Sequence, residues 1–297
     1  ESKLNKKDLW SKDLIYIVTY KATKKYDLMI YLTDGSIFYS TAKKNLLHFQ
    51  VPFKNTVAKG FWGKIKSSTW NLAICNSLFT QKYINQSWSI KTALLYPPVE
   101  TEKIKPLKKE KWILSVGRFA SFSKSKKHEE MINAFKELLN EKEISDWSLH
   151  LAGSIEGDAN YINELKALAD KTPIYFYPNL VFDELVKLYG KSSIYWHAAG
   201  FDEDEPKKME QFGITTVEAM AAGCIPIVTN KGGQSEIVDN NLNGYLWDNI
   251  DELISQTKKV ITNPDNNEQL SKEAIIKSKL FTKNCFAENL YSIIKNI

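Results

Sequence analysis

The sequence predicts an α/β fold with two parallel sheets, and three observations support this prediction. Short apolar segments alternate with amphipathic segments along the chain, which is typical of strands and helices in βαβ units. Such units form parallel sheets with helices on both faces. The alternation stops at the polar, charged residues 100–110 and then begins again, and 297 residues are enough for two domains. We therefore expect two α/β domains, with the polar segment as the linker between them.

The region before the linker, residues 1–108, predicts short strands separated by helices. Residues 3–25 have apolar positions close to helical spacing and predict a helix, although residues 15–20 would also suit a strand. Asp34-Gly35 is a turn that ends the first strand, and Ser77 is a typical helix N-cap. We expect strands at residues 26–33, 45–53, 72–76 and 92–96, and helices at residues 59–70 and 77–86.

The region after the linker, residues 109–281, predicts a longer alternation of the same kind. Its first helix carries apolar residues on one face, at Met131, Ile132, Phe135, Leu138 and Leu139. We expect strands at residues 112–116, 147–152, 173–177, 193–198, 224–229 and 244–247. We expect helices at residues 127–140, 159–169, 183–189, 215–223, 250–263 and 266–280, and a last amphipathic helix at 282–296. In open sheets of this kind, ligands bind at the carboxyl ends of the strands.

Composition and cysteine use exclude several classes of protein. Hydrophobic residues make up 43% and aromatic residues 12% of the chain, which are globular values. No apolar run is long enough to span a bilayer. The three cysteines are far apart and the four histidines form no cluster. We therefore expect buried thiols in a reducing, cytoplasmic compartment and no structural metal site.

Charge is unevenly distributed along the chain. Residues 1–110 contain 19 lysines, no arginine and eight acidic residues, whereas the rest of the chain has a net negative charge. A basic region suits an anionic partner, such as nucleic acid, an anionic membrane surface or a phosphate-bearing lipid. The alternative is that lysine simply occupies every solvated face of this region.

Residues 196–238 hold the strongest site pattern. Glu210 and Glu218 are separated by seven residues, and Gly213 lies between them where a helix should begin. Carboxylates accept hydrogen bonds from vicinal hydroxyls, and the amides of Gly213, Ile214 and Thr215 would face phosphate at the helix start. The alternative is that Glu210 is a capping or surface acid and that Glu218 is exposed to solvent. Against it, Glu218 lies among small and apolar residues, where a lone charge is usually partnered or functional.

Basic residues follow the first strand of the second region. Gly117 and Arg118 come directly after the strand at residues 112–116, and Lys126 and Lys127 open the next helix. Arginine gives a forked set of donors and lysine a mobile point charge, so both suit the neutralisation of a diphosphate. The alternative is a solvated basic loop.

Three further features have two interpretations each. His197 follows an apolar strand, and it either contacts a sugar hydroxyl or packs in the core. His48 either lines an acceptor pocket or packs in the first region. Residues 232–236 form a glycine turn into a helix, and the turn either cradles anions or sugar hydroxyls with its amides or simply changes the chain direction.

Together these motifs resemble glycosyltransferase family 4, the retaining nucleotide-sugar transferases with the GT-B fold. The matching segments keep the family's order and spacing: V-G-R at 116–118, K-K-H-E-E-M-I-N-A-F at 126–135, F-Y-P-N-L at 176–180, the pair Glu210 and Glu218, and P-I-V-T-N-K-G-G-Q-S-E-I-V at 226–238. The segment W-H-A-A-G-F, followed by F-G-I-T-T-V-E-A-M-A-A-G-C-I-P, is most similar to the mannosyltransferase-like branch.

The resemblance implies a role for each matching residue. Arg118 and Lys126 would bind the donor diphosphate, and Glu210 would contact the donor sugar near the reacting carbon. Glu218 would hold the ribose, and Asn179 and Leu180 would lie against the base. The other expected donor contacts are the amides of Gly213, Ile214 and Thr215 and the side chain of His197, while His48 is the candidate on the acceptor side.

The resemblance also implies an activity and its requirements. A hexose would move from a GDP- or UDP-sugar to a glycan or lipid-linked acceptor with retention of configuration, without a metal ion or another cofactor. Asp202 and Asp204 form a D-x-D pattern that holds Mn²⁺ or Mg²⁺ in another class of glycosyltransferases. In a run of four acidic residues we favour a solvated surface loop.

The expected organisation is two Rossmann-like domains in a GT-B arrangement. Residues 1–108 would form the acceptor-side domain, residues 109–281 the donor domain, and residues 282–297 a helix that crosses back to the first domain. The first region is shorter than in the family and lacks its opening strand and glycine-rich loop, so we expect this domain to be partial or truncated. The partners would be the donor, the acceptor and, through the lysines, the cytoplasmic membrane face, with no nucleic acid. The alternative function is a module that binds donor only, or an inactive fragment.

Overall fold

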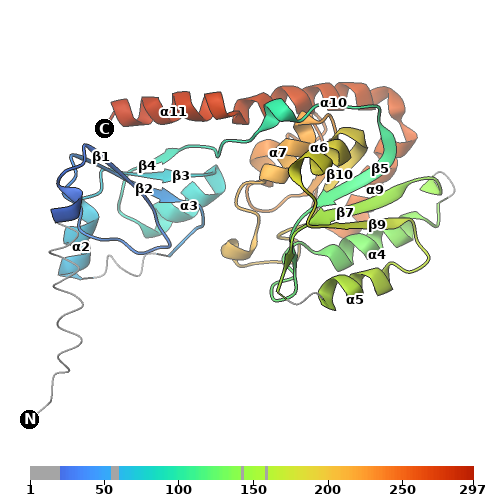
Figure 1. The fold of residues 1–297 in the computed structure, drawn as a ribbon, viewed down its shortest axis with the longest axis horizontal. Coiled ribbons are helices and arrows are strands. Elements are labelled where there is room, and N and C mark those ends of the chain that lie inside the picture. The colour runs from blue at the N-terminus through green and yellow to red at the C-terminus, as the bar shows by residue number, and fades with distance from the viewer. Residues whose placement is uncertain (1–20, 55–59, 142–143, 158–159) are drawn as a thin grey trace, which may run out of the picture. The chain divides into compact units, whose positions relative to one another are not determined.

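The structure is a computed structural model that describes all residues except 1–20, 55–59, 142–143 and 158–159 (Figure 1). Most of the helix predicted at residues 3–25 therefore lies outside the described residues. Contacts divide the chain into two compact units. The first unit contains the chain up to Tyr96 together with Glu288–Ile297, and the second contains Pro97–Ala287.

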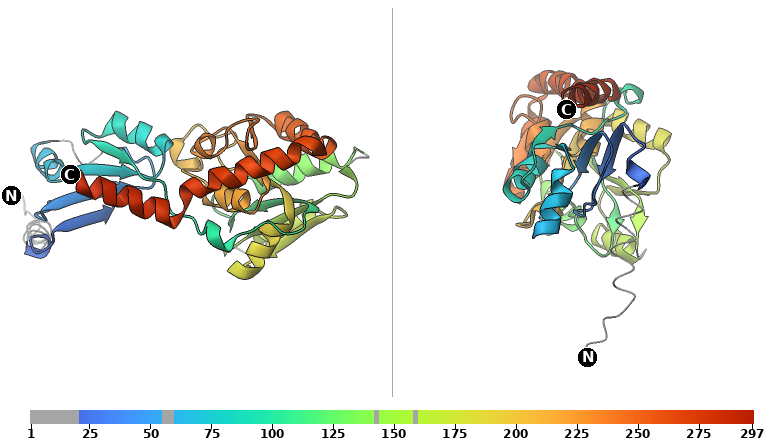
Figure 2. Two further views of the ribbon diagram at one scale, coloured as in Figure 1. Left: turned by 90° about the horizontal axis from the view of Figure 1, so that it is seen from above. Right: turned by 90° about the vertical axis from the view of Figure 1, so that its left-hand side faces the viewer.

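The first unit has a four-stranded parallel sheet, as the sequence predicts. Strands β1 (Leu28–Leu32), β2 (Lys44–Phe49), β3 (Leu72–Cys75) and β4 (Thr92–Leu94) lie in sequence order, and the first two lie side by side in the end-on view of Figure 2 (dark blue). Helices α2 (Phe61–Ser68) and α3 (Leu78–Ser87) follow β2 and β3. Ser77 caps α3 as expected, because its hydroxyl oxygen accepts from the Thr80 amide at 3.0 Å. Phe49, Trp70 and Trp88 are among the buried residues in the core of the first unit.

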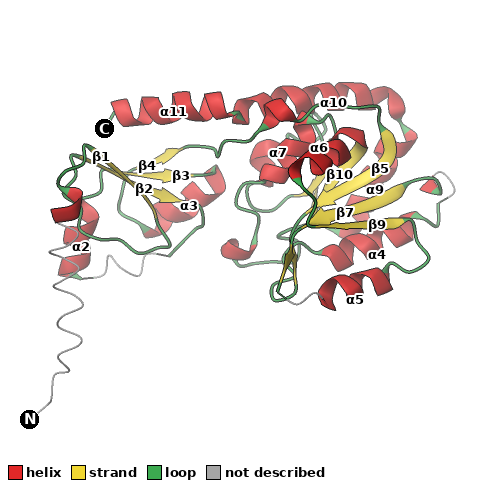
Figure 3. Cartoon of the chain, in the orientation of Figure 1, coloured by secondary structure: helices red, strands yellow, loops and turns green. Residues whose placement is uncertain are grey.

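The second unit has a six-stranded parallel sheet covered by helices on both faces. The strand order is β12-β11-β10-β5-β7-β9, and the helices alternate with these strands along the chain (Figure 3). Helices α4 and α5 lie on one side of the sheet and α6 and α7 on the other (Figure 1). Phe135, Leu149 and Trp196 are fully buried between the sheet and the first pair of helices.

The bounds of the second unit match the predicted elements within a few residues. The strands are β5 (Glu110–Val116), β7 (Ser148–Gly153), β9 (Ile174–Pro178), β10 (Ser192–His197), β11 (Ile225–Thr229) and β12 (Tyr245–Trp247). The helices are α4 (His128–Leu138), α5 (Asn160–Leu168), α6 (Phe182–Lys191), α7 (Ile214–Ala221), α8 (Gln234–Ile237), α9 (Ile250–Thr262) and α10 (Pro264–Ser278). The last helix, α11 (Lys283–Lys295), contains residues of both units.

Two short strands were not predicted. Strands β6 (Phe119–Ala120) and β8 (Ile155–Glu156) form a small parallel sheet of their own. Each has two residues, too few to give an alternating pattern. They join the loop after β5 to the loop after β7.

The predicted linker at residues 100–110 belongs to the second unit and is partly buried there. Thr101 and Ile104 are 8% and 2% exposed, and the contact division falls before Pro97, whereas the predicted boundary is 108. Lys109 donates to the carbonyl oxygens of Ser192 and Ala222, both at 2.7 Å. Its buried amine therefore joins the start of β10 to the end of α7, and burial lowers the pKa of Lys109. A buried lysine with two carbonyl partners at the end of the segment therefore adds to the polar composition that predicted a linker.

Strand β5 marks the switch point of the large sheet. The chain runs from β5 to β7 and β9 on one side and then returns to β10, β11 and β12 on the other. Because β5 pairs in parallel with both β10 and β7, the loops after these strands meet at one edge. Ligands bind at this place in open α/β sheets.

Candidate active site

A cavity of about 330 Å³ lies at this edge, beside the carboxyl ends of β5 and β7. Its volume lies in the range of small-molecule sites. Five of the residues predicted from the sequence line it: Arg118, Lys126, Asn179, Leu180 and Thr215. The remaining lining residues include Gly117, Gly153, Ser154 and Leu185. Residues that the sequence predicts to bind the donor therefore line a single cavity.

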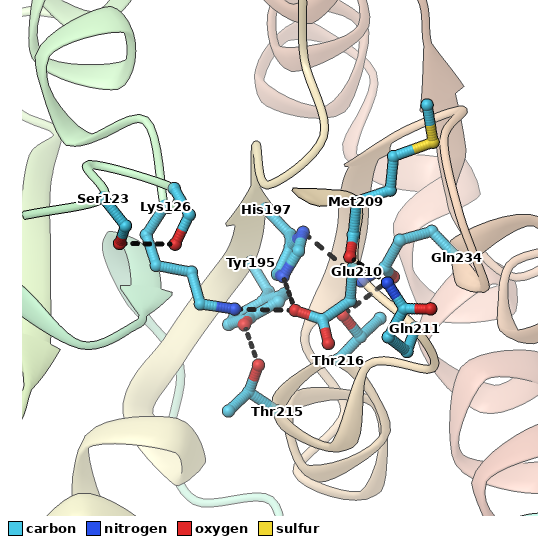
Figure 4. Close-up of polar contacts among 11 residues, drawn as sticks. Ser123, Lys126, Tyr195, His197, Met209, Glu210, Gln211, Thr215, Thr216 and Gln234 are labelled. Carbon is cyan, nitrogen blue, oxygen red and sulfur yellow. Dashed lines mark hydrogen bonds and ion pairs between the residues drawn. The ribbon is translucent and has the colours of Figure 1, made fainter. Parts of the chain in front are cut away.

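An ion pair between Lys126 and Glu210 lies at the centre of the site. Lys126 Nζ is 2.6 Å from Glu210 Oε2, and each side chain is 21% exposed. His197 Nε2 lies 3.2 Å from the same oxygen, and His197 is 2% exposed. Figure 4 shows both side chains directed at the Glu210 carboxylate. The structure thus brings together three residues that the sequence placed on three separate segments.

Two buried side chains extend this cluster behind His197. Gln234 Nε2 lies 3.3 Å from His197 Nδ1, and the Thr216 hydroxyl donates to Gln234 Oε1 at 3.0 Å. Gln234 and Thr216 are both fully buried. Gln234 belongs to the predicted glycine turn at residues 232–236 but was not predicted as a site residue, because a single glutamine has no distinctive spacing.

The charges of this cluster set the protonation of its members. Burial acts to raise the pKa of the Glu210 carboxyl, but the hydrogen bond from His197 and the charge of Lys126 hold that pKa below its usual value. Burial lowers the pKa of His197, and the charge of Lys126 acts in the same direction, whereas Glu210 opposes them. At neutral pH the cluster therefore contains an ionised Glu210 beside a neutral His197.

Helix α7 begins at Ile214, a few residues after Glu210, as predicted. Gly213 precedes it with φ 119°, a backbone conformation that residues other than glycine rarely adopt. The first amides of a helix have no acceptor within the helix, so those of Ile214 and Thr215 are free to meet an anion. Buried Tyr195 donates to the Thr215 hydroxyl at 2.7 Å and so orients this first turn.

Glu218 is not part of the Lys126 cluster. Its Oε2 accepts a hydrogen bond from the buried Tyr189 hydroxyl at 2.8 Å. Burial raises the pKa of Glu218, although this hydrogen bond opposes the shift. Glu218 is thus a partnered and half-buried carboxylate, and the interpretation of a solvated glutamate is wrong.

Arg118 is directed differently from Lys126. Its Nη1 atom lies 3.1 and 3.2 Å from the two carboxylate oxygens of Glu156 on β8, and the side chain is 61% exposed. Glu156 was not predicted as a site residue, because β8 was not predicted. Arg118 nevertheless lines the cavity together with Lys126.

Asn179 and Leu180 follow β9 as expected. Asn179 has a left-handed backbone with φ 56°, and its side-chain oxygen accepts from the Ile155 amide at 3.0 Å. The Asn179 side chain therefore braces the loop after β7. His48 lies on β2 of the first unit and is partly buried, which lowers its pKa.

The acidic run is less uniform than predicted. Asp202, Asp204 and Glu205 are exposed, but Glu203 is only 21% exposed and lies 3.0 Å from Lys127 Nζ. The expectation of a uniformly solvated loop is therefore wrong at Glu203. In the part of the chain that the structure describes, no group of three His, Cys, Asp or Glu side chains could hold a metal ion. None of the described helices is long and apolar enough to cross a membrane.

A family model described as "Glycosyl transferases group 1" matches residues 99–277, which is more than half of the chain. The chain belongs to this glycosyltransferase family. The match covers the whole cavity edge, with Arg118, Lys126, His197 and Glu210 inside it.

Curated relatives are similar to the same region. A GDP-Man:Man(3)GlcNAc(2)-PP-Dol alpha-1,2-mannosyltransferase of Xenopus laevis is 28% identical over 222 residues, which is 68% of this chain and 43% of the relative. The human protein of the same name is 27% identical over 65% of this chain and 41% of its own length. The chain thus spans less than half of the length of these relatives.

Solved glycosyltransferases share the fold. A glycosyltransferase from Rickettsia africae has a TM-score of 0.76 at 20% identity, with 100% of this chain and 83% of that chain covered. Anabaena Alr3699/HepE, in complex with UDP and glucose, has a TM-score of 0.71 at 16% identity, covering 97% of this chain and 83% of that one. The predicted α/β fold of the GT-B type is confirmed.

Glu210 and Glu218 should affect stability in opposite directions. The folded pKa of Glu210 lies below its unfolded value, so its carboxylate stabilises the fold above about pH 4.3 and loses this contribution as the pH falls further. The folded pKa of Glu218 lies above its unfolded value, so its ionisation destabilises the fold at neutral pH. We expect E210Q to lower, and E218Q to raise, the free energy of unfolding at pH 7.

Urea unfolding at neutral and acidic pH measures both differences. The E218Q difference should vanish toward about pH 4, where Glu218 is protonated in both the folded and the unfolded state, whereas the E210Q difference should persist there and shrink only as the pH falls further toward the lowered folded pKa of Glu210. An E218Q variant that is less stable than the wild type at pH 7 would contradict the environment described for this carboxyl.

Proposed function

We propose that this chain carries the donor site of a family 4 retaining glycosyltransferase of the mannosyltransferase-like branch. In this proposal a hexose moves from a nucleotide-sugar to a glycan or lipid-linked acceptor, and no metal ion takes part. The observation that carries the proposal is the contact of Lys126 and His197 with one carboxylate oxygen of Glu210 at the edge of a cavity at the sheet's switch point.

The residues at the cavity suit the departure of a diphosphate. Arg118 and Lys126 line one cavity, and the amino terminus of α7 adds backbone donors close to Thr215, which also lines it. Fixed donors aimed at developing charge are a large source of catalysis, because they need no reorganisation during the reaction. In the proposed reaction these groups stabilise the leaving nucleoside diphosphate without a metal ion.

Glu210 suits a contact to the donor sugar rather than proton transfer. A carboxylate with a lowered pKa is a weak base, since it binds a proton poorly at neutral pH. In the proposed step, the bond between the anomeric carbon and the diphosphate oxygen breaks, and the acceptor hydroxyl oxygen forms a new bond to the same face of that carbon. The acceptor proton passes to the leaving phosphate, so Glu210 stays ionised and stabilises the positive charge that develops on the sugar.

The proposed donor is GDP-mannose and the proposed acceptor is a glycan or lipid-linked saccharide. Support comes from the curated relatives, whose printed names give a GDP-Man donor and a PP-Dol acceptor. Glu218, held by Tyr189, is proposed to accept from the ribose hydroxyls, and Asn179 and Leu180 to border the base. The rival donor is a UDP-sugar, because a structural relative binds UDP and glucose.

The alternative function is a module that binds the donor without transferring its sugar. It shares the cavity and its cations, so binding does not distinguish it from the enzyme. Its distinctive expectation is donor binding with neither transfer to acceptors nor hydrolysis of the donor.

Removal of Glu210 or Lys126 should greatly weaken transfer. We expect E210A and K126A each to lower kcat by about 100-fold or more, the usual effect of losing a group that stabilises transition-state charge, and EDTA to have no effect. Release of nucleoside diphosphate, with and without acceptor, measures the rate. K258A is the matched control, because Lys258 forms a comparable but exposed ion pair with Glu141 at 2.7 Å.

Two outcomes would contradict this assignment. Loss of activity in EDTA with rescue by Mn²⁺ would return the D-x-D residues Asp202 and Asp204 to consideration. Undiminished transfer by E210A would remove Glu210 from the reacting centre.

Donor choice can be tested by ligand stabilisation of the fold. A ligand that binds the folded state stabilises it by mass action and so raises Tm. At a ligand concentration of 100 times its Kd, the free energy of unfolding rises by about 2.7 kcal/mol. We expect GDP and GDP-mannose to raise Tm more than UDP and UDP-glucose at equal concentration, and K126A to abolish the difference. A larger shift with the uridine compounds would assign the site to the rival donor.

Peripheral membrane association at the cytoplasmic face is also proposed, through the lysine-rich residues 1–110. Co-sedimentation of the full chain with vesicles that contain anionic lipid should exceed that with neutral vesicles and fall as salt is raised. Equal sedimentation with both kinds of vesicle would favour the simpler explanation that these lysines are solvated.

A further inference from the structure

We propose that Gln234 and Thr216 hold His197 as a neutral imidazole with its proton on Nε2, and that this fixed tautomer positions Glu210. The tautomer follows from the contacts alone. Its consequence for sugar transfer rests on the proposed function. Gln234 and Thr216 would then be positioning residues, since they act on the reacting groups only through His197.

The donor and acceptor capacities along the line of contacts allow one assignment. An ionised carboxylate only accepts hydrogen bonds, so His197 Nε2 must donate across the 3.2 Å to Glu210 Oε2. A neutral imidazole has one N–H, so Nδ1 must accept. The group that faces Nδ1 at 3.3 Å must therefore be the NH₂ of Gln234.

Thr216 fixes the same orientation from the other end. With the Gln234 NH₂ toward His197, the amide oxygen faces the Thr216 hydroxyl, which donates to it at 3.0 Å. Protonation of His197 Nδ1 would place its N–H against the NH₂ group of Gln234. Rotation of the Gln234 amide would remove this repulsion, but it would break the hydrogen bond from Thr216. Because both residues are fully buried, water cannot replace the lost bonds, and this makes the rotation costly.

The surroundings of His197 also favour the neutral ring. The titratable groups that the described residues bring to it are Glu210, Lys126 and Tyr195, whose ring centroid is 6.5 Å away. Lys126 already supplies the positive charge to the carboxylate oxygen that His197 contacts. A second positive charge in the same buried place would be repelled.

The turn that carries Gln234 also holds the backbone of Glu210. The Gly233 amide donates to the Glu210 carbonyl oxygen at 2.8 Å. A Cβ atom on Gly232 would lie 2.0 Å from that oxygen, so only glycine allows this approach. The turn therefore holds Glu210 in two ways. Gly233 binds its backbone directly, and Gln234 acts on its carboxylate through His197.

The tautomer can be read by ¹⁵N NMR of the ring nitrogens in full-length protein labelled at histidine. Comparison with H197Q assigns the His197 signals, and His150 is an internal reference because its two ring nitrogens face the hydroxyls of Ser148 and Tyr177. At pH 7 we expect the wild-type His197 to be protonated at Nε2 only. Protonation at Nδ1, or at both nitrogens, would overturn the inference without any variant.

Two variants test whether Gln234 and Thr216 control this state. Q234E places a carboxylate against Nδ1, so we expect both nitrogens of His197 to be protonated at pH 7. T216V frees the Gln234 amide to rotate. As the pH is lowered, we therefore expect His197 in T216V to take up its second proton at a higher pH than in the wild type, but at a lower pH than in Q234E. Q269E, an exposed substitution of the same kind on α10, should leave His197 unchanged.

The link to catalysis has a separate readout. We expect Q234E to lower kcat about tenfold, as loss of orienting partners does at metal-bound histidines, with little change in KM and in Tm. A charged His197 with an undiminished kcat would overturn the positioning role. A wild type that shows the expected tautomer but neither transfers nor hydrolyses any donor would instead count against the proposed function.

Discussion

The ion pair between Lys126 and Glu210 joins two loops that are 84 residues apart in the sequence. These loops follow β5 and β10, which are neighbours in the sheet because the chain adds β7 and β9 on one side of β5 and then returns to add β10 on the other. Parallel strands place their carboxyl ends at one edge, so the topology itself brings the lysine and the glutamate together. The other features of the site, including the start of α7 and the glycine turn before α8, are arranged around this contact.

A half-buried carboxylate needs more than one donor to remain ionised. Removal of a charge from water costs several kcal/mol unless hydrogen bonds and an opposite charge replace the solvent. Glu210 has both kinds of partner on one oxygen, and the imidazole that serves it is itself held by Gln234 and Thr216. The result is a cluster of polar groups in which each donor faces an acceptor. Such a cluster specifies one geometry, because every alternative leaves a buried group without a partner.

The fold could be predicted from the sequence because its elements have strong local signals. The alternation of apolar segments, the cap at Ser77 and the glycine before α7 all lie where the structure has the corresponding strand or helix boundary. The positions of Lys126 and Glu210 could be predicted from motifs. Their mutual contact could not, since it depends on strand order rather than on spacing. Gln234 and Glu156 were missed for the same reason: each matters only through a partner on a distant segment.

The two cations proposed to receive the donor diphosphate differ in how firmly they are already held. Arg118 pairs with Glu156 at an exposed site, where water screens the attraction and the net stabilisation is small. A diphosphate can therefore displace Glu156 at little cost and meet the free fork of the guanidinium.

Lys126 pairs with Glu210 in a more enclosed place, beside a neutral His197. Loss of this partner would leave Glu210 with a single neutral donor, so Lys126 must keep its contact with Glu210 while it approaches phosphate. In the proposed reaction, Arg118 then supplies most of the charge for initial binding. In the same proposed reaction, Lys126 would lie between the leaving phosphate and the Glu210 carboxylate, where charge would separate as the bond from the sugar to the diphosphate breaks.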